Sequence, residues 1–210
     1  VIALSTDKAV TPINLYGATK LCSEKLFIAA NNIKGWNKIK FSVVRYGNVV
    51  GSRGSVIPFF LEQKKKGFLS VTNKKMTRFN MKLSEAVHMV LWSLKQNIGG
   101  EIFVPKLPSY RILDLANAID INCKIKIVGI RPGEKLDEEL ITIQESNNCY
   151  DLGKYFAIVP SYNKDLLKLY SKKNKKIKKQ ISYNSGNNKK FLNIKELKKI
   201  IKDYSKNFNV

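Results

Sequence analysis

The stretch that decides the fold is Leu4-Ser5-Thr6-Asp7-Lys8-Ala9-Val10, which is followed by Asn14-Leu15-Tyr16-Gly17-Ala18-Thr19-Lys20. The first part predicts an apolar strand that ends in hydroxyl and charged residues, and the second predicts a helix that opens with the pattern Y-x-x-x-K. Ligands of a doubly wound sheet bind at the carboxyl ends of its strands, so we expect these polar side chains to face a ligand. Tyr16 and Lys20 are expected one helical turn apart on the same face. Because an ammonium group favours the phenolate form of a nearby phenol, Tyr16 is a candidate general base.

Strand-like and helix-like segments alternate along the rest of the chain. The predicted strands are Val1–Leu4, Phe41–Tyr46, Leu69–Thr72, Glu101–Val104 and Lys124–Ile130, and the predicted helices are Tyr16–Ala30, Ser55–Lys66, Leu83–Leu94, Ile112–Ile119, Glu134–Ile141 and Ile194–Tyr204. A glycine-containing loop, Gly47–Gly54, follows the second predicted strand. This alternation is typical of an α/β fold, and we predict a doubly wound, mainly parallel sheet.

The charge balance of the 210-residue chain is strongly basic, with 38 basic and 16 acidic residues and a net charge of +22. Such a balance raises the alternative of a basic module that binds nucleic acid or acidic polymers. Only five of the basic residues are arginine, and residues 164–206 hold 15 lysines beside three acidic residues. This tail contains no arginine and few interleaved aromatic residues, so base readout and base stacking have little support. We therefore favour a solvated surface and expect no nucleic-acid partner.

The cysteines and the single histidine exclude several classes of site. Cys22, Cys123 and Cys149 are scattered without C-x-x-C spacing, which excludes a disulfide framework and fits a reducing cytoplasm. His88 is the only histidine, so a histidine-based triad and a multi-histidine metal site are both excluded, and we predict no metal. The longest apolar runs fall far short of the roughly 20 residues that a membrane-spanning helix needs, so no membrane partner is expected.

Several motifs together resemble the extended short-chain dehydrogenase/reductase superfamily and, within it, the nucleotide-sugar 4,6-dehydratases among the polysaccharide biosynthesis proteins. They are Leu4–Lys20, Arg45–Phe60, Met76–Phe79, Gly99–Pro105 and Gly129–Leu136, and they span residues 1 to about 160. Thymidine-diphosphate-glucose dehydratases have Asp-Glu where this chain has Asp7-Lys8, and configuration-retaining relatives have Met at the place of Tyr16. The chain is therefore most similar to the inverting UDP-N-acetylglucosamine 4,6-dehydratases of pseudaminic acid biosynthesis. A retaining dehydratase, or another nucleotide-sugar dehydratase or epimerase, is the alternative.

The resemblance implies the C-terminal part of an NADP-binding, Rossmann-like domain with a smaller substrate-binding subdomain. The cofactor and catalytic part would cover about residues 1–55, the substrate-binding part largely 56–160, and a Lys-rich extension 161–210 would end in a helix. The G-x-x-G-x-x-G turn that binds the cofactor diphosphate is not in the sequence. We therefore expect the chain to be a fragment of a longer enzyme and to be inactive by itself. The resemblance also implies a cytoplasmic homo-oligomer.

The resemblance assigns the catalytic roles to residues of the first two motifs. Tyr16 would take the proton of the sugar 4-hydroxyl while NADP accepts the hydride from carbon 4. Lys8 would remove the proton on carbon 5, and protonated Asp7 would assist departure of the 6-hydroxyl as water. Lys20 would bind the nicotinamide ribose, and Thr6 would bind the sugar near its 4-hydroxyl.

Binding residues follow from the same correspondence. The implied cofactor-binding residues are Lys8, Tyr16, Lys20, Val49, Val50, Gly51, Ser52 and Arg53, and the implied substrate-binding residues are Thr6, Asn48, Val56, Thr72, Arg131 and Glu134. Among these, Arg131 would meet the diphosphate, which suits the forked guanidinium, and Glu134 would meet the nucleoside ribose. The chain departs from the family pattern at Asn80, where Trp is usual, and at Asp137, where His is frequent.

Overall fold

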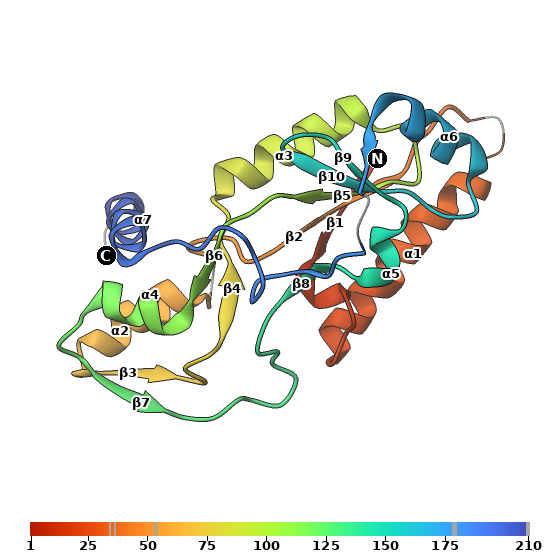
Figure 1. Ribbon diagram of the computed structural model, residues 1–210. Coiled ribbons are helices and arrows are strands. Elements are labelled where there is room, and N and C mark those ends of the chain that lie inside the picture. Colours follow the sequence, from red (N-terminus) through yellow and green to blue (C-terminus); the bar gives the residue numbers. More distant parts are fainter. Residues whose placement is uncertain (34, 36, 53, 178–179, 209–210) are drawn as a thin grey trace. The chain divides into compact units, whose positions relative to one another are not determined.

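The computed structural model describes residues 1–33, 35, 37–52, 54–177 and 180–208 (Figure 1). The chain forms two compact units, and each unit is described by itself. Unit 1 consists of Val1–Gly47, Ser84–Lys106 and Glu139–Asn184, and unit 2 consists of Asn48–Leu83, Leu107–Glu138 and the chain from Ser185 onward. The units are thus interleaved along the sequence, whereas the sequence analysis divides the chain linearly near residues 55 and 160. The Lys-rich extension in particular contributes to both units.

Unit 1 is built on a six-stranded sheet in the order β1-β2-β5-β10-β9-β11. The strands are β1 (Ile2–Thr6), β2 (Ser42–Tyr46), β5 (Ile102–Pro105), β10 (Tyr155–Ile158), β9 (Cys149–Asp151) and β11 (Lys175–Lys176). The first three strands are parallel, which confirms the predicted α/β fold with a parallel sheet. The other three add to the sheet in antiparallel fashion, which the sequence analysis did not predict. β2 is buried along nearly its whole length, as a central parallel strand requires.

Helices complete unit 1. They are α1 (Leu15–Ile33), α3 (Leu83–Gln96), α5 (Ile143–Ser146) and α6 (Lys164–Lys173), with a 3₁₀ turn η1 at Asp7–Ala9. α1 packs against β1 and β2. Trp92 of α3 makes an edge contact with Phe103 of β5, at 5.3 Å between ring centroids, and a tilted contact with Tyr155 of β10 at 4.4 Å. These aromatic contacts fix α3 on the sheet.

The predicted helix Glu134–Ile141 is wrong. Residues 134–138 form a loop, and Glu139–Ile141 is the strand β8, which pairs antiparallel with β12 (Tyr183–Asn184). The carbonyls of Lys135 and Leu136 accept hydrogen bonds from the Arg78 side chain instead of from helical amides. A long-range partner therefore overrides the local helical pattern.

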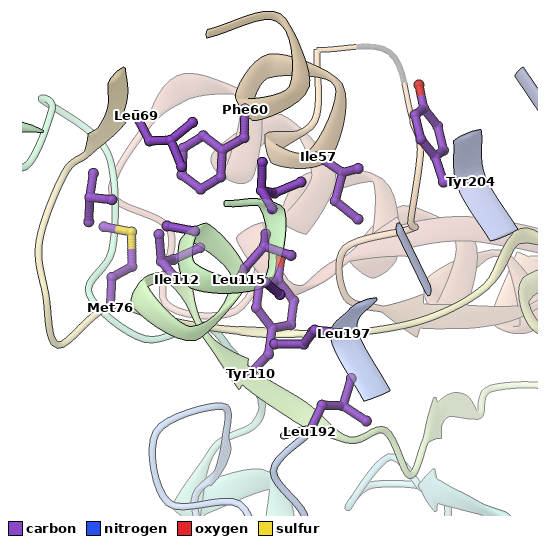
Figure 2. Packing of buried hydrophobic residues seen from close by; sticks show 14 residues of the cluster. Ile57, Phe60, Leu69, Met76, Tyr110, Ile112, Leu115, Leu192, Leu197 and Tyr204 are labelled. Atoms are coloured by element: carbon purple, nitrogen blue, oxygen red, sulfur yellow. The ribbon is translucent and has the colours of Figure 1, made fainter. Parts of the chain in front are cut away.

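Unit 2 is built around a separate apolar core. Its elements are α2 (Val56–Lys64), β3 (Phe68–Val71) paired with β7 (Lys124–Ile127), β4 (Thr77–Phe79) paired with β6 (Ser109–Arg111), α4 (Ile112–Ile119) and α7 (Ile194–Phe208). Figure 2 shows the core cluster, in which Phe60, Leu115 and Leu197 are almost completely buried. Each such side chain stabilises the fold by about 1.5–3 kcal/mol. The predicted amphipathic helix at Ile194–Tyr204 is confirmed, and its apolar face packs on α4.

No described helix is long and apolar enough to cross a membrane. No cluster of three or more metal-ligating side chains occurs in the described part of the chain. The three cysteines are free thiols, and burial raises the pKa of Cys149 to about 12, so that thiol is protonated at neutral pH.

Candidate active site

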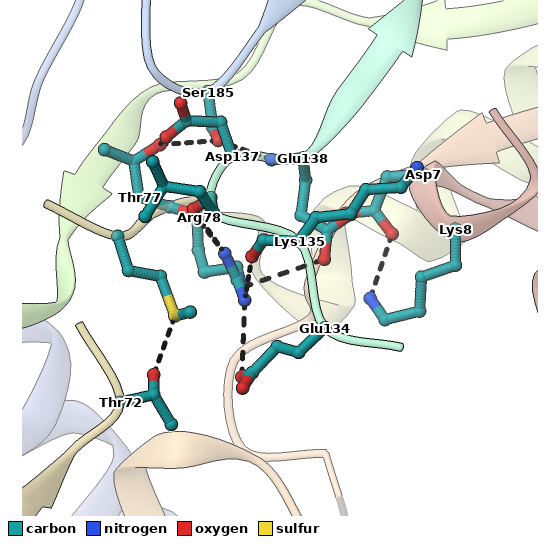
Figure 3. Close-up of polar contacts among 12 residues, drawn as sticks. Asp7, Lys8, Thr72, Thr77, Arg78, Glu134, Lys135, Asp137, Glu138 and Ser185 are labelled. Atoms are coloured by element: carbon teal, nitrogen blue, oxygen red, sulfur yellow. Dashed lines mark hydrogen bonds and ion pairs between the residues drawn. The ribbon is translucent and has the colours of Figure 1, made fainter. Parts of the chain in front are cut away.

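One group of candidate site residues lies in unit 1, in the turn that follows β1. Asp7 begins η1 and is completely buried, while the Lys8 side chain is 34% exposed. Thr6 caps the turn, because its hydroxyl accepts a hydrogen bond from the Lys8 amide at 3.3 Å and donates one to Asp7 Oδ1 at 2.9 Å. Lys8 Nζ also donates to Asp7 Oδ1, at 3.1 Å (Figure 3). The other carboxylate oxygen of Asp7 is buried and has no hydrogen-bond partner in the described structure.

That oxygen can accept a hydrogen bond from a bound molecule. A buried polar atom without a partner costs about 1–3 kcal/mol, and more for a charged group. Such atoms are rare in native structures, and they occur where a substrate, ion or water completes the bonding. Asp7 therefore has the arrangement of an acid or acceptor that acts on a bound molecule, next to a lysine that can exchange a proton.

The helix α1 brings the second pair of side chains. Asn14 precedes α1 and accepts a hydrogen bond from the Gly17 amide at 2.8 Å, which fixes the first turn. Tyr16 is 53% exposed, and Lys20, one turn further on, donates to the carbonyl of Leu4 in β1 at 3.2 Å. Tyr16 and Lys20 lie one turn apart on α1, as the spacing predicts, and Lys20 also contacts β1.

Gly17 explains how close α1 comes to η1. A Cβ atom at this position would lie 2.2 Å from the carbonyl oxygen of Lys8 and 3.0 Å from Pro12. Real Cβ atoms do not approach backbone oxygens so closely, so only glycine permits this packing. Gly17 thereby sets the spacing between the Asp7-Lys8 turn and the first turn of the helix that carries Tyr16.

Tyr46 is a residue of this region that the sequence analysis missed. It ends β2 and pairs with Thr6 in the register of the parallel strands. Burial, and to a smaller extent electrostatic repulsion from Tyr16, raises the pKa of Tyr46 above its usual value of 10.0. Tyr46, at the carboxyl end of β2, is thus close enough to Tyr16 of α1 for the two phenols to interact electrostatically. The sequence does contain a signal for this residue, because Tyr46 ends a predicted strand and immediately precedes Gly47.

A cluster of ion pairs joins the elements of unit 1 that carry this group of residues. The Arg45 guanidinium is 1% exposed and donates to both carboxylate oxygens of Glu24 in α1, at 2.9 and 2.6 Å. It also donates to both oxygens of Glu145, at 3.0 and 2.9 Å, and to the carbonyl of Leu140. Burial alone would lower the pKa of Arg45, but the two carboxylates raise it overall, so the guanidinium is charged. Glu24 lies one turn after Lys20, so the cluster holds the α1 face that carries Tyr16 and Lys20.

A second group of candidate site residues belongs to unit 2 and begins with the loop after β2. Val50 donates its amide to the carbonyl of Met81 at 2.8 Å, and the Met81 amide donates to the carbonyl of Asn48 at 3.2 Å. Gly51 follows with a φ of +75°, a conformation that favours glycine. Asn48 Oδ1 is buried without a partner in the described structure, as expected of a ligand contact.

Other predicted members of this loop have different surroundings. The side chains of Val50 and Val56 are partly buried and pack against the apolar core of unit 2. The amide of Ser52 donates to the carbonyl of Val49 at 3.3 Å and closes a turn. Arg53 lies outside the described residues. Thr72 donates its hydroxyl to the sulfur of Met76 at 3.1 Å (Figure 3).

The predicted diphosphate and ribose residues lie on one turn of unit 2. The Glu134 amide donates to the Arg131 carbonyl at 3.0 Å, and Gly133 has a φ of +76°, which together describe a type II turn with Pro132 at its second position. The Glu134 carboxylate also accepts from the Arg131 amide at 3.4 Å. Arg131 is exposed and Glu134 is half-buried. The structure thus brings these two predicted residues together.

Arg78 supports this turn and was not predicted as a site residue. Its guanidinium donates to the carbonyls of Thr77 and Leu136, at 2.6 and 3.0 Å, and to the carbonyl of Lys135 at 3.0 Å (Figure 3). It also approaches the Glu134 carboxylate at 3.5 Å. The sequence signal was an arginine inside the motif Met76–Phe79, but two of its carbonyl partners, Lys135 and Leu136, lie more than 50 residues further along the chain.

Comparisons with known proteins show the family to which the chain belongs. Residues 1–160 match the family described as polysaccharide biosynthesis protein. The chain belongs to this family. Over 208 residues it is 49% identical to the inverting UDP-N-acetylglucosamine 4,6-dehydratase of Campylobacter jejuni, a match that covers 95% of this chain and 62% of that relative. It is 41% identical to a UDP-glucose 4-epimerase of Rickettsia canadensis, with 96% of this chain and 60% of the relative covered. The chain thus spans about three fifths of the length of these relatives.

Solved structures give the same fold assignment. Pen from Bacillus thuringiensis superposes with a TM-score of 0.86 at 35% identity, covering 98% of this chain and 62% of that structure. A UDP-galactose 4-epimerase structure superposes with a TM-score of 0.56 at 16% identity, over 99% of this chain and 63% of that one. At that identity the second likeness shows the fold alone. The predicted Rossmann-like α/β fold is confirmed.

Proposed function

We propose that the complete gene product is an NADP-dependent lyase that removes water across carbons 4 to 6 of UDP-N-acetylglucosamine and inverts carbon 5. Its product would be a UDP-4-keto-6-deoxy-N-acetyl-hexosamine for pseudaminic acid-type nucleotide-sugar biosynthesis. The observation that carries the proposal is the buried Asp7 carboxylate, with one oxygen on Lys8 and Thr6 and the other without a partner in the described structure. The identity to the inverting dehydratase of Campylobacter jejuni supports the same reading.

The residues of unit 1 have groups suited to each proton transfer. Tyr16 is exposed and would accept the proton of the sugar 4-hydroxyl at its phenolic oxygen. Lys8 would take the proton from carbon 5 at its amine, and Asp7 would deliver a proton to the departing 6-hydroxyl. Thr6 holds the Asp7 carboxylate in place through its own hydroxyl and would bind the sugar close to the 4-hydroxyl.

The residues present fit a nicotinamide cofactor. Tyr16 and Lys20 place a phenol and an ammonium group on one exposed face of α1, and both kinds of group hydrogen-bond well to ribose hydroxyls. Lys8 lies in η1, whose backbone packs against the first turn of the same helix. In unit 2, the left-handed Gly51 lies between Val49, Val50 and Ser52 and would let a cofactor approach the loop backbone without side-chain bulk. When bound, NADP supplies the oxidation at carbon 4 and the reduction at carbon 6. Arg53 is included in the proposal from the family correspondence alone.

The residues of unit 2 would bind the nucleotide sugar. Arg131 is exposed on its turn and would meet the diphosphate, and Glu134 would accept hydrogen bonds from the ribose hydroxyls. Asn48, with its unpartnered buried oxygen, and Thr72 would meet the sugar. Val56 would contribute an apolar edge. A homo-oligomer and a cytoplasmic location stay predictions from the resemblance.

The test is the reaction run in deuterium oxide with UDP-N-acetylglucosamine and followed by NMR. We expect a 4-keto-6-deoxy product of L-arabino configuration, with deuterium on carbon 5, because that proton leaves and returns through exchangeable side chains. Carbon 6 should receive the hydrogen that left carbon 4. An initial product of D-xylo configuration would assign the protein to the retaining group.

A second candidate function is 4-epimerisation, because several relatives of 41–42% identity are named UDP-glucose 4-epimerase. An epimerase leaves the 6-hydroxyl in place, so its product keeps the CH₂OH signals. A dehydratase product has a methyl doublet at carbon 6 instead. The same NMR experiment, repeated with UDP-glucose, separates the two functions.

A further inference from the structure

A short segment near the end of the described chain holds the loop that follows the Arg131 turn. The segment is Ser185-Gly186, and its partners are residues 136–138 in unit 2. Ser185 donates its amide to the carbonyl of Glu138 at 2.8 Å, and its hydroxyl accepts from the Glu138 amide at 2.9 Å. Ser185 is completely buried. A residue 47 positions away in the sequence thus makes two hydrogen bonds to one residue of an irregular loop.

Thr77 of β4 also forms hydrogen bonds with the loop 136–138. Its amide donates to the carbonyl of Leu136 at 3.1 Å, and its hydroxyl donates to Asp137 Oδ1 at 2.5 Å. The hydroxyls of Thr77 and Ser185 are also hydrogen-bonded to each other at 2.7 Å. Thr77 is 5% exposed, so these bonds are formed away from solvent, where hydrogen bonds are electrostatically stronger (Figure 3).

Gly186 allows the backbone of the segment to approach Asp137 closely. A Cβ atom at position 186 would lie 2.6 Å from the Asp137 carboxyl group, so the backbone of the segment lies directly against that side chain. Asp137 is therefore enclosed between the Thr77 hydroxyl and the Gly186 backbone. The sequence analysis had marked Asp137 only as a departure from the family pattern.

The consequence concerns the turn just before this loop. Residues 134–138 have no helix or strand to fix them, and Arg131 and Glu134 depend on the loop for their position. We propose that Thr77, Asp137 and Ser185 are positioning residues that pre-organise the Arg131–Glu134 turn for a nucleoside diphosphate. This rests on the proposed function of that turn. A pre-organised loop binds more tightly, because less conformational freedom is lost on binding.

The sharpest test replaces Thr77 in two ways in the complete gene product. Thr77→Val is nearly isosteric and removes the hydroxyl, whereas Thr77→Ser retains it. We expect Thr77→Val to raise the Kd for UDP, measured by calorimetry, and the KM for the nucleotide sugar by roughly three- to tenfold, with kcat within about twofold of wild type. Thr77→Ser should restore both constants, because it keeps the hydroxyl that bonds Asp137 and Ser185.

A second variant keeps the proposal testable if Thr77→Val fails to fold. Ser185→Ala should raise the Kd for UDP similarly and accelerate hydrogen exchange at the Glu138 amide, which loses its hydroxyl acceptor. Ser93→Ala is the matched control, because Ser93 is also completely buried but its hydroxyl has no partner in the described structure of unit 1. Unchanged UDP affinity in both Thr77→Val and Ser185→Ala would overturn the proposal.

The failure of the proposed function gives a different result. If wild type binds UDP but does not convert UDP-N-acetylglucosamine, the dehydratase assignment is wrong, and the variants still decide whether the loop positions a nucleoside diphosphate. If wild type does not bind UDP, the positioning proposal is overturned as well.

Discussion

The two groups of candidate site residues are held in place by different kinds of structure. In unit 1, Asp7 and Lys8 follow a strand, and Tyr16 and Lys20 lie on the first turns of a long helix. In unit 2, Arg131 and Glu134 lie on a turn of an irregular loop. Regular elements fix the first group through their own backbone bonding, whereas the second group depends on side chains that reach the loop from elsewhere in the chain.

The anchors of the two groups differ in the same way. Arg45 is paired with two carboxylates, so unit 1 contains a buried cluster of full charges. Arg78 donates mainly to backbone carbonyls, and Thr77 and Ser185 add hydroxyl groups. Full charges placed inside a protein give a rigid arrangement that is costly to break, and carbonyl and hydroxyl bonds give smaller individual contributions. We therefore expect unit 1 to control the chemistry and unit 2 to control binding.

The largest expected effect is on kcat, and it comes from replacing a residue of the unit 1 group. In the complete gene product, Lys8→Met should lower kcat by about 10²–10⁴-fold, because it removes a positioned general base. NADP affinity should stay largely intact, because Tyr16 and Lys20 would still bind the cofactor. Arg131→Met should instead raise the KM for the nucleotide sugar. Steady-state kinetics and cofactor titration measure both, and wild-type turnover by Lys8→Met would remove that residue from the mechanism.

The contrast between the groups also explains what the sequence could predict. The Asp7-Lys8 turn and the Tyr16–Lys20 helix have local signals, because apolar periodicity marks the strand and helix that carry them. The parallel part of the sheet and ten of the eleven predicted strands and helices, among them Ile112–Ile119, are found close to their predicted bounds. Such features depend on neighbours in the sequence.

The features that were missed depend on distant partners. The segment 134–138 has a helical pattern, but Arg78 and Thr77 take its carbonyls. The antiparallel strands β9, β10 and β11 are short, and their pairing is fixed by tertiary contacts. The roles of Tyr46 and Ser185 follow only from strand register and from a hydrogen bond across 47 residues. No periodicity in the sequence encodes these contacts.

The second prediction compares a buried with an exposed ion pair. Arg45→Met should destabilise the protein by about 3–5 kcal/mol, because it leaves Glu24 buried without its counter-charge. Lys64→Met is the matched control, since Lys64 pairs with Asp120 but is 45% exposed, and it should cost less than about 1 kcal/mol. Urea denaturation followed by circular dichroism gives both values, and equal losses would show that the Arg45 cluster does not anchor unit 1.

The third prediction concerns Gly17 and has a smaller effect. Helix propensity alone would make Gly17→Ala stabilising by about 1 kcal/mol. The contact with the Lys8 carbonyl predicts the opposite, because the added methyl group must push α1 away from η1. We expect kcat to fall by about ten- to a hundredfold, since small displacements of catalytic groups are costly. Ala29→Ser, on the exposed side of the same helix, is the control and should leave kcat unchanged.

The last prediction uses pH to distinguish the ion cluster that anchors unit 1 from the hydroxyl group of Ser185 that anchors the loop of unit 2. Burial would raise the pKa of Glu145, but Arg45 and the Thr142 amide lower it overall, below its usual 4.5. A carboxyl group whose pKa is lower in the folded than in the unfolded protein stabilises the fold above the unfolded value. That contribution is lost as the pH falls through the folded value, because the carboxylate must then be protonated.

Glu145→Gln should therefore be less stable than wild type at pH 7, and the difference in the free energy of unfolding should shrink as the pH is lowered from 5 toward 3. Ser185→Ala provides the matched control, because the bonds that it removes join a hydroxyl to a backbone amide and to the Thr77 hydroxyl, none of which carries a charge. Its destabilisation should be the same at pH 7 and at pH 4. Urea denaturation at a series of pH values and constant ionic strength measures both differences. A Glu145→Gln difference that does not change with pH would mean that Glu145 contributes through packing rather than charge, and the distinction between the two anchoring modes would then rest on Arg45 and Glu24 alone.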